Sequence, residues 1–325
     1  MRSDPRLSIC VPTYQRPDLL VRALGSALQG GSRAGEVEVL VSDNSVDARS
    51  GELARDLLNN YPGPGRYVLN RPGVGAVPNF NRCRELATGE YVLILHDDDY
   101  LLPGAVDSIL DATAPGQPDH PVLLFGTHVV GVRGEVRRRQ VFRTERYLPP
   151  KIALTRLLSN SSFVRFPAIV VHRDAYEQTG PFNVEVRNPT DFEMWIRLFT
   201  RYGVRCMPAV TCAYTVHAGA LTEEMFKAGS VDTLMGIFEQ VARDGPLTAA
   251  ELRRLQSDFF HQWVLAGASR RLRLWDRAGA RQILGLFRLP SVRALGLSPK
   301  WAPVRMVFTA LTAAPKLGPG STATR

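Results

Sequence analysis

The chain has 325 residues, of which 45% are hydrophobic, 8% aromatic and 22% charged, and its formal net charge is +9. This composition is typical of a soluble globular protein, and the length suffices for one large α/β domain with an appendage or for two modest domains. The four cysteines are scattered without a Cys-x-x-Cys pair, which argues against a structural zinc site and a disulfide framework and fits a reducing cytoplasm.

The sequence contains no stretch typical of a membrane span or an export signal. The apolar run at 7–11 is too short for a signal peptide, and no run reaches the roughly 18–20 residues that cross a bilayer. We therefore expect a cytoplasmic protein, with peripheral contact at the inner face of the membrane as a further option. Residues 246–325 hold 13 lysines and arginines against three acidic residues. Such a basic region can meet anionic lipid, nucleic acid or an acidic partner, or can simply be solvated.

Strands and helices are predicted to alternate over the first hundred residues. Short β-prone runs occupy 7–11, 36–41, 66–70 and 91–95, and apolar residues at helical spacing occupy 18–27, 53–58 and 79–88. Asp18 is expected to cap the first of these helices. The alternation predicts right-handed βαβ units and a largely parallel sheet, in which ligands bind beyond the carboxyl ends of the strands.

The second part of the chain is predicted to add strands and then only helices. A helix follows Pro103, and strands are expected at 122–125, 168–172 and 205–215, with a helix at 191–202. The basic stretch 133–147 fits an exposed hairpin or a flexible loop. A capping-box pattern starts a long helix at Thr248, and residues 318–325 are expected to be disordered. We predict an α/β domain over 1–221 and a basic helical region over 222–325.

Three aspartates follow the buried strand at 91–95. Asp97, Asp98 and Asp99 would repel one another at a strand end, so a cation is expected beside them, most simply a divalent metal that holds a phosphorylated ligand. The alternative is an acidic turn in which Asp99 or a neighbour merely caps a helix.

Several motifs occur in a shared order along the chain. The segments 12–16, 43–45, 79–89, 97–99 and 191–198 resemble those of family 2 glycosyltransferases, and the resemblance covers roughly residues 7–220. It implies the GT-A fold, a mostly parallel sheet flanked by helices, with residues 1–221 as the nucleotide-sugar-binding and catalytic domain. It also implies inversion at the anomeric carbon. His96 and Gln15 depart from the family pattern, where a further acidic residue and an asparagine are common.

The resemblance implies a nucleotide-diphosphate sugar donor and a bound Mg²⁺ or Mn²⁺ that stabilises the departing diphosphate. Asp99 is the first choice as metal ligand, while Asp97 or Asp98 contacts the ribose or a metal-bound water; Asp97 is also a candidate ligand. His217 is either a ligand near the metal or diphosphate or an ordinary loop residue. His96 is expected to orient the acidic turn or to pack beneath it.

The same resemblance implies a nucleotide pocket at the ends of the first strands. Pro12, Thr13 and Tyr14 are expected to form its floor, with Tyr14 either stacked on the base or packed structurally. Arg16 meets a phosphate or is a solvated surface arginine.

Two further polar residues belong to this pocket. Asp43 is expected to read uracil or thymine, unless it only forms an Asx turn with Asn44 and Ser45. Asn79 touches the nucleotide or caps the helix that it opens.

The resemblance also implies that Asp191 is the general base. Because this residue is predicted at a helix start, it could instead be an N-cap. Glu193 is the rival base, and Trp195 is expected to pack in the core.

These residues predict an inverting, metal-assisted transfer from a UDP- or dTDP-linked sugar to an acceptor hydroxyl. A sugar nucleotidyltransferase and a non-catalytic nucleotide-sugar-binding protein are the alternatives; the first usually needs a Gly-rich loop, which 12–16 lacks. The C-terminal helices could contact anionic lipid, to meet a lipid-linked acceptor, or form a homo-oligomer. No nucleic-acid partner is expected.

Overall fold

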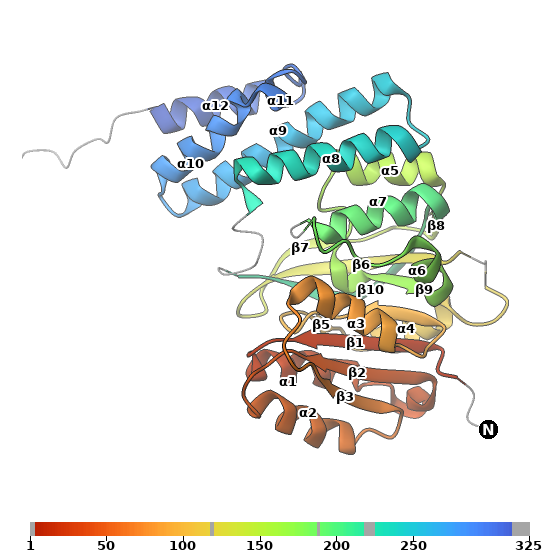
Figure 1. The fold of residues 1–325 in the computed structure, drawn as a ribbon. Helices are drawn as coiled ribbons and strands as arrows, with labels where there is room; N and C mark the ends of the chain where they lie inside the picture. Colours follow the sequence, from red (N-terminus) through yellow and green to blue (C-terminus); the bar gives the residue numbers. More distant parts are fainter. Residues whose placement is uncertain (1–3, 118–119, 187–188, 218–224, 314–325) are drawn as a thin grey trace, which may run out of the picture. The chain divides into compact units, whose positions relative to one another are not determined.

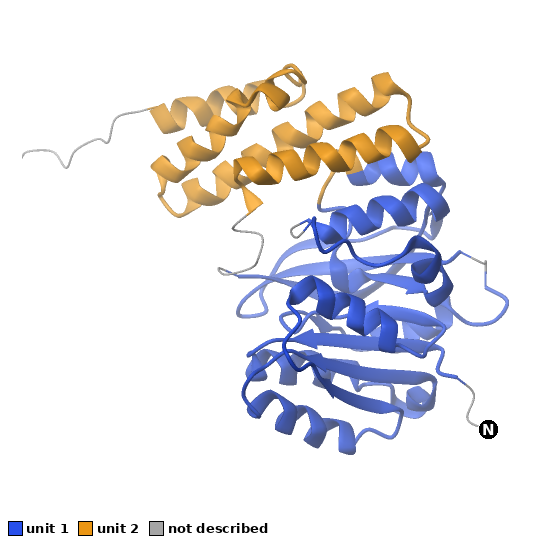
Figure 2. Cartoon of the chain, viewed as in Figure 1, with its two compact units in different colours: residues 1–157, 162–220 blue, residues 158–161, 221–325 orange. Residues whose placement is uncertain are grey.

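The computed structural model describes residues 4–117, 120–186, 189–217 and 225–313. Two compact units divide the chain, the first comprising residues 1–157 and 162–220 and the second residues 158–161 and 221–325 (Figure 2). The stretch 318–325, predicted to be disordered, lies outside the described residues.

A ten-stranded mixed sheet forms the centre of the first unit (Figure 1). Its order is β3 (Gly65–Leu69), β2 (Val37–Asp43), β1 (Leu7–Thr13), β4 (Tyr91–Ile94), β9 (Ile169–His172), β6 (Val122–Gly131), β10 (Val204–Val216) and β5 (Tyr100–Leu101). Strands β3, β2, β1 and β4 pair in parallel, as do β6 and β10, whereas β9 runs antiparallel between β4 and β6. The predicted α/β class with a mostly parallel sheet is confirmed.

Helices follow most of these strands. They are α1 (Pro17–Ala27), α2 (Arg49–Asn59), α3 (Ala76–Leu86), α4 (Ala105–Ala112), α5 (Pro150–Ser159), α6 (Arg173–Thr179) and α7 (Thr190–Tyr202), with short 3₁₀ turns η1 (Gly31–Glu36) and η2 (Phe166–Ala168). Every residue of β1 and β2 is buried, which explains why these strands are continuous apolar runs rather than alternating ones.

Two expected helix starts are wrong. In α1, Arg16 occupies the cap position and Pro17 the first turn, so Asp18 lies inside the helix and forms no cap. Proline suits that first position because its fixed φ is helical and its missing N–H needs no partner there. Helix α3 begins three residues before Asn79, since Gly75 takes a positive φ of 83° and turns the chain into the helix.

The basic stretch at 133–147 forms strands rather than an irregular loop. β7 (Val136–Gln140) pairs antiparallel with β6, and β8 (Arg146–Leu148) pairs antiparallel with β10. Four of the five β7 residues are exposed, so this hairpin edge is polar and solvated.

The second unit is helical. It contains α8 (Ala228–Asp244), α9 (Ala249–Arg273), α10 (Arg277–Leu284), α11 (Pro290–Arg293) and α12 (Ala302–Ala313), with a 3₁₀ turn η4 at Gly285–Arg288. The predicted capping box at the start of α9 is present, with Thr248 and Glu251 bonded to each other's backbone N–H. Phe238, Phe259, Phe260 and Trp263 form an aromatic core between α8 and α9. None of the helices in the described ranges combines the length and apolar character needed to cross a membrane.

A buried carboxylate ties together the amino-terminal ends of the central strands. Glu38 is 1% exposed and accepts hydrogen bonds from Ser8 Oγ (2.5 Å), the Thr88 N–H (2.8 Å) and Arg66 Nη1 (3.2 Å). Because these donors come from β1, the turn before β4 and β3, one side chain joins neighbouring parts of the sheet.

We expect Glu38→Ala to lower the free energy of unfolding by about 2 kcal/mol, because it leaves buried donors without an acceptor. Urea unfolding followed by circular dichroism measures the change. The matched control is Glu36→Ala, which removes an exposed carboxylate paired with Arg33 and should change stability by about 0.5 kcal/mol or less. Equal effects of the two substitutions would contradict this role of Glu38.

Candidate functional site

The carboxyl ends of four parallel strands meet at one edge of the sheet. β1 ends at Thr13, β2 at Asp43, β4 shortly before Asp97, and β10 just before His217. All of these strands point the same way, so residues far apart in the sequence come together there.

The three aspartates of the turn after β4 each have a distinct set of partners. Asp97 accepts hydrogen bonds from Thr13 Oγ1 (2.8 Å) and Arg16 Nη1 (3.3 Å). Asp98 pairs with the same Arg16 nitrogen (3.3 Å) and with His217 Nε2 (2.9 Å).

Asp99 lies deepest and faces β10. Its Oδ1 accepts the main-chain N–H of Thr215 at 2.7 Å. Arg22, on α1, stabilises the turn from the other side by donating from Nη2 to the main-chain oxygen of Asp98 at 2.5 Å. The turn is therefore held by the first helix and by the last strand of the sheet.

Burial and neighbouring charge separate the three carboxyl pKa values. Burial raises the pKa of Asp97 and, far more, that of Asp99, and the charge of Asp98 adds to both shifts. Burial also opposes ionisation of Asp98, but His96, His217 and Arg16 outweigh it and hold the pKa of Asp98 below its usual range. Asp98 is thus the carboxylate that this site keeps ionised most easily.

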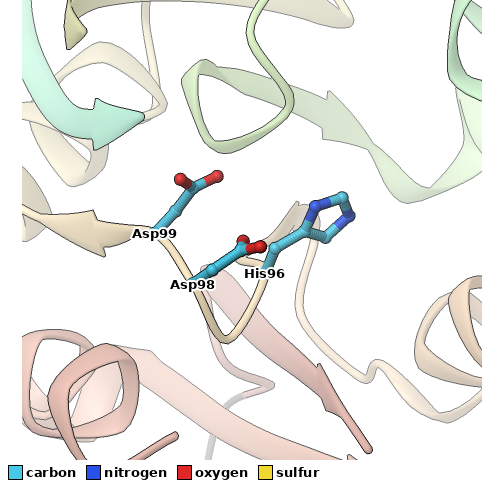
Figure 3. Close-up of side chains that lie close together, drawn as sticks. All are labelled: His96, Asp98 and Asp99. Carbon is cyan, nitrogen blue, oxygen red and sulfur yellow. The ribbon is translucent and has the colours of Figure 1, made fainter. Parts of the chain in front are cut away.

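His96, Asp98 and Asp99 form a cluster that fits a metal ion. One donor atom from each lies within 4.8 Å of the others, and all three side chains come from the turn between β4 and β5 (Figure 3). Asp99 Oδ2 and His96 Nε2 are buried and lack a hydrogen-bond partner among the described residues. Buried polar atoms without partners are costly, and a divalent cation would satisfy both.

His96 also packs beneath the turn, as one of its two expected roles requires. Its ring stacks on Phe80 with centroids 5.0 Å apart and lies 4.3 Å from the ring of Phe166. That it also offers a donor nitrogen to the cluster was not foreseen. The assignments of Asp97 and His217 as ligands stay predictions, since Asp97 is bonded to Thr13 and Arg16, and His217 reaches the cluster through Asp98.

The polar residues at the end of β2 are bonded to one another. Asp43 is fully buried; its Oδ1 accepts the Ser45 N–H (2.7 Å) and its Oδ2 the Tyr67 hydroxyl (2.8 Å). The first bond is the Asx turn offered as the alternative to base recognition, and the base-reading role stays a prediction. Tyr67 was not identified from the sequence, because nothing in its strand distinguishes it from a packing residue.

Asn79 supports this edge from beneath. It is 3% exposed, and its side chain bonds the Ser42 hydroxyl (2.6 Å), the Ser42 carbonyl (3.0 Å) and Asn70 (3.1 Å). The expectation that it caps α3 is wrong. Pro12 is buried within β1, while the side chain of Tyr14 is 56% exposed at the mouth of this region.

Asp191 lies in the first turn of α7, half-buried, and its Oδ1 accepts the N–H of Phe192 at 2.8 Å. The N-cap position belongs to Pro189, so Asp191 is not the cap. Burial raises the pKa of Asp191, and the nearby charges of His96 and Arg165 partly offset the rise.

The other candidates on α7 are engaged in structure. Glu193 is buried and forms a two-point ion pair with Arg197 at 2.6 and 2.9 Å. Trp195 packs edge-on against Phe166 and Phe182 in the core, as predicted.

Arg165 and Tyr214 connect Asp191 electrostatically with the acidic turn. The guanidinium of Arg165 lies 4.6 Å over the Tyr214 ring, and burial lowers the pKa of Arg165. Burial raises the pKa of Tyr214, and the charges of Asp99 and Asp191 both raise it further. Arg165 and Tyr214 therefore interact electrostatically with both carboxylate sites, Asp99 in the acidic turn and Asp191 on α7. No sequence pattern marked either residue, because Arg165 precedes a short turn and Tyr214 lies within a strand.

The sequence of this chain matches a known family and several curated relatives. The family model described as Glycosyl transferase family 2 matches residues 8–180. An uncharacterized protein of Mycobacterium tuberculosis is 27% identical over 214 residues, 63% of this chain and 66% of the relative. The GalNAc(5)-diNAcBac-PP-undecaprenol beta-1,3-glucosyltransferase of Campylobacter jejuni is 31% identical over 134 residues, 41% of either chain. Both matches span less than two thirds of the relative's length.

Solved structures share the fold. TarS 1–349 of S. aureus in complex with UDP-GlcNAc is 18% identical with a TM-score of 0.64, over 94% of this chain and 87% of that one. The mannosyltransferase PcManGT from Pyrobaculum calidifontis, in complex with GDP-Man and Mn²⁺, is 20% identical with a TM-score of 0.58, over 96% and 81% of the two chains.

We expect Asp98→Asn and His96→Phe to weaken Mn²⁺ binding about tenfold or more, because each removes one donor of the cluster. Electron paramagnetic resonance of free Mn²⁺ during titration measures the affinity without any turnover. Asp107→Asn, on the first turn of α4, is the control and should bind Mn²⁺ as the unmodified protein does. Unchanged affinity in both cluster variants would exclude this group as the metal site.

Proposed function

This chain belongs to glycosyltransferase family 2, and from that premise we propose that it transfers a sugar from a nucleotide diphosphate to an acceptor hydroxyl with inversion at the anomeric carbon. The observation that carries the proposal is the position of Asp191. Its carboxyl is half-buried and separate from the acidic turn, and the charge of Arg165 acts on both. A base and a leaving-group site on opposite sides of one substrate are what inversion requires.

The donor side of the proposed site is built from the turn after β4. Arg16 bridges Asp97 and Asp98 and is available to a diphosphate, with its side chain 39% exposed. We propose a UDP- or dTDP-linked donor, with Asp43 at the end of β2 as the base-reading residue. The structure of TarS with UDP-GlcNAc supports a nucleotide-sugar donor for this fold.

His96, Asp98 and Asp99 would hold Mg²⁺ or Mn²⁺, and the bound ion would supply positive charge against the departing diphosphate. The PcManGT complex with GDP-Man and Mn²⁺ supports this choice of ion. Arg16 and, when protonated, His217 add positive charge from the protein at the same place.

The chemical step moves one proton and one sugar. Asp191 takes the proton of the acceptor hydroxyl as its oxygen forms a bond to the anomeric carbon. The bond from that carbon to the diphosphate oxygen breaks, and its electron pair leaves with the nucleotide diphosphate. Asp191 can serve because Phe192 N–H engages only its Oδ1, and no residue of the described ranges is seen to bond Oδ2, which can receive the proton of the hydroxyl.

We further propose a cytoplasmic enzyme whose acceptor is carried on a lipid at the inner face of the membrane. The Campylobacter jejuni relative, whose name specifies an undecaprenol-linked acceptor, supports this proposal. Family membership favours transfer over the sugar nucleotidyltransferase alternative.

Asp191→Asn is expected to reduce sugar transfer at least about a hundredfold, the scale of general-base catalysis, while the affinity for the nucleotide sugar stays within about twofold. Turnover assays and calorimetric donor binding measure the two quantities. Glu193→Gln is the comparison, and any loss there should follow a loss of folding stability, because Glu193 pairs with Arg197. Unchanged turnover in Asp191→Asn would remove this residue from the mechanism.

The raised pKa of Asp191 predicts the acid limb of the pH profile. The base must be ionised, so kcat falls as the pH drops through its pKa, and burial places that point above the usual aspartate value of about 3.9. Measurement at saturating donor and Mn²⁺ separates this effect from ligand binding. An acid limb at or below the usual value would contradict the assignment.

A further inference from the structure

Trp275 is an exposed tryptophan in a conformation that bulky residues avoid. It lies in the turn between α9 and α10 with a φ of 59° and 87% of its surface exposed. Its N–H donates to Leu272 O (3.0 Å), and its carbonyl accepts from Arg277 N–H (3.1 Å), so the backbone fixes the side chain outward. Glycine would fit this backbone without strain, and the neighbouring Leu274 is also 66% exposed.

The outer face of α12 is apolar as well. Met306 is 72% exposed, Val307 56% and Leu311 50%, and Thr312 on the opposite face is buried. The cationic side chain of this helix, Arg305, lies 4.0 Å over the ring of Phe287 and so turns toward the second unit's own core. The helix therefore presents hydrocarbon, not charge, to its surroundings.

Helix α10 follows the Trp275 turn and packs against the buried face of α12, where Thr312 lies. Arg281 donates a hydrogen bond to Thr312 O at the end of α12. Arg281 is only one helical turn, about 6 Å along the axis, from Arg277 beside the Trp275 turn. In Figure 1 the end of α9, helix α10 and the end of α12 lie on the same side of the helical unit. We name Leu274 and Trp275 the Trp275 surface; Met306, Val307 and Leu311 form a second exposed apolar strip, on α12.

The helical unit that carries the Trp275 surface is basic. Between residues 225 and 313 there are 13 lysines and arginines and six acidic residues. Arg270, Arg273 and Arg281 are exposed near the turn. Arginines in the last turn of α9 also complement the helix dipole, so their presence points to a partner only together with the apolar surface.

We propose that the Trp275 surface inserts into the interface of an anionic lipid bilayer, with the indole at the headgroup level and the arginines on the lipid phosphates. The inference deepens the membrane contact proposed above and rests on it for its biological purpose. Its physical test requires no sugar transfer, so the two proposals can fail separately.

A bilayer fits the charge pattern better than a second copy of the chain does. Two copies would bring together two strongly basic surfaces, which repel each other. A nucleic acid would use the arginines but would leave the aliphatic side chains of α12 without a role.

Co-sedimentation with phosphatidylcholine vesicles, with and without phosphatidylglycerol, tests the proposal on the full-length chain. We expect binding to the anionic vesicles and weak binding to the neutral ones. Trp275→Gly should weaken partitioning about tenfold, the effect of losing one buried large apolar side chain. Its thermal midpoint should not fall, because glycine relieves the strained φ and little packing is lost.

Charge variants separate lipid binding from general basicity. Arg270→Gln with Arg273→Gln should reduce binding to anionic vesicles. Arg253→Gln with Arg254→Gln removes the same charge about 24 Å away along α9 and should bind as the unmodified chain does. Donor hydrolysis in solution should be unchanged in all these variants.

Three results would overturn the proposal. The first is a failure of the unmodified chain to bind anionic vesicles, and the second is equal binding by Trp275→Gly. The third is a dimer, seen by light scattering, that Trp275→Gly dissociates, because the surface would then belong to a second copy.

Discussion

The burial of three consecutive carboxyl groups at the end of β4 is the constraint on which the candidate site depends. Side chains of this kind repel one another and lose hydration, so the surroundings must supply opposite charge and hydrogen-bond donors. Here they are supplied by Arg16 at the cap of α1, by the Thr215 N–H within β10, and by His217 just after β10. The compensation is incomplete, since two buried polar atoms, His96 Nε2 and Asp99 Oδ2, still lack hydrogen-bond partners within the described part of the chain. A site in this state favours a cation and a phosphate-bearing ligand.

The sequence was sufficient to predict an α/β fold with a mostly parallel sheet, whereas the roles of the site residues stay predictions. Continuous apolar runs predicted buried parallel strands, and polar residues after those runs had to meet at their shared edge. Individual capping assignments failed because capping depends on backbone angles. Pro17 and Gly75 set the starts of α1 and α3, and each shifted the start from the expected polar residue. The part of the site that no pattern revealed, Arg165, Tyr67 and Tyr214, comes from residues whose chemistry is defined only by what folds against them.

In the helical unit, too, the sequence predicted the core but not which apolar residues stay exposed. The apolar spacing of α9 predicted its core, since Phe259 and Trp263 pack inward. The exposed apolar residues of the Trp275 surface are not distinguishable in the sequence from core residues of a short helix, and only their exposure in the folded structure separates them. The basic composition of this region can be read from the sequence. Which partner it favours depends on the positions of the exposed apolar side chains, which only the structure shows.

The bond between the Thr215 N–H and Asp99 has a consequence for synthesis. Its two partners are separated by 116 positions in the chain. A nascent polypeptide therefore emerges from the ribosome with β1, β2 and β4 long before the strand that completes the acidic turn. Until β10 has been made, Asp99 lacks the Thr215 N–H as a partner. The acidic turn can therefore reach the arrangement described above only after nearly the whole first unit has been translated.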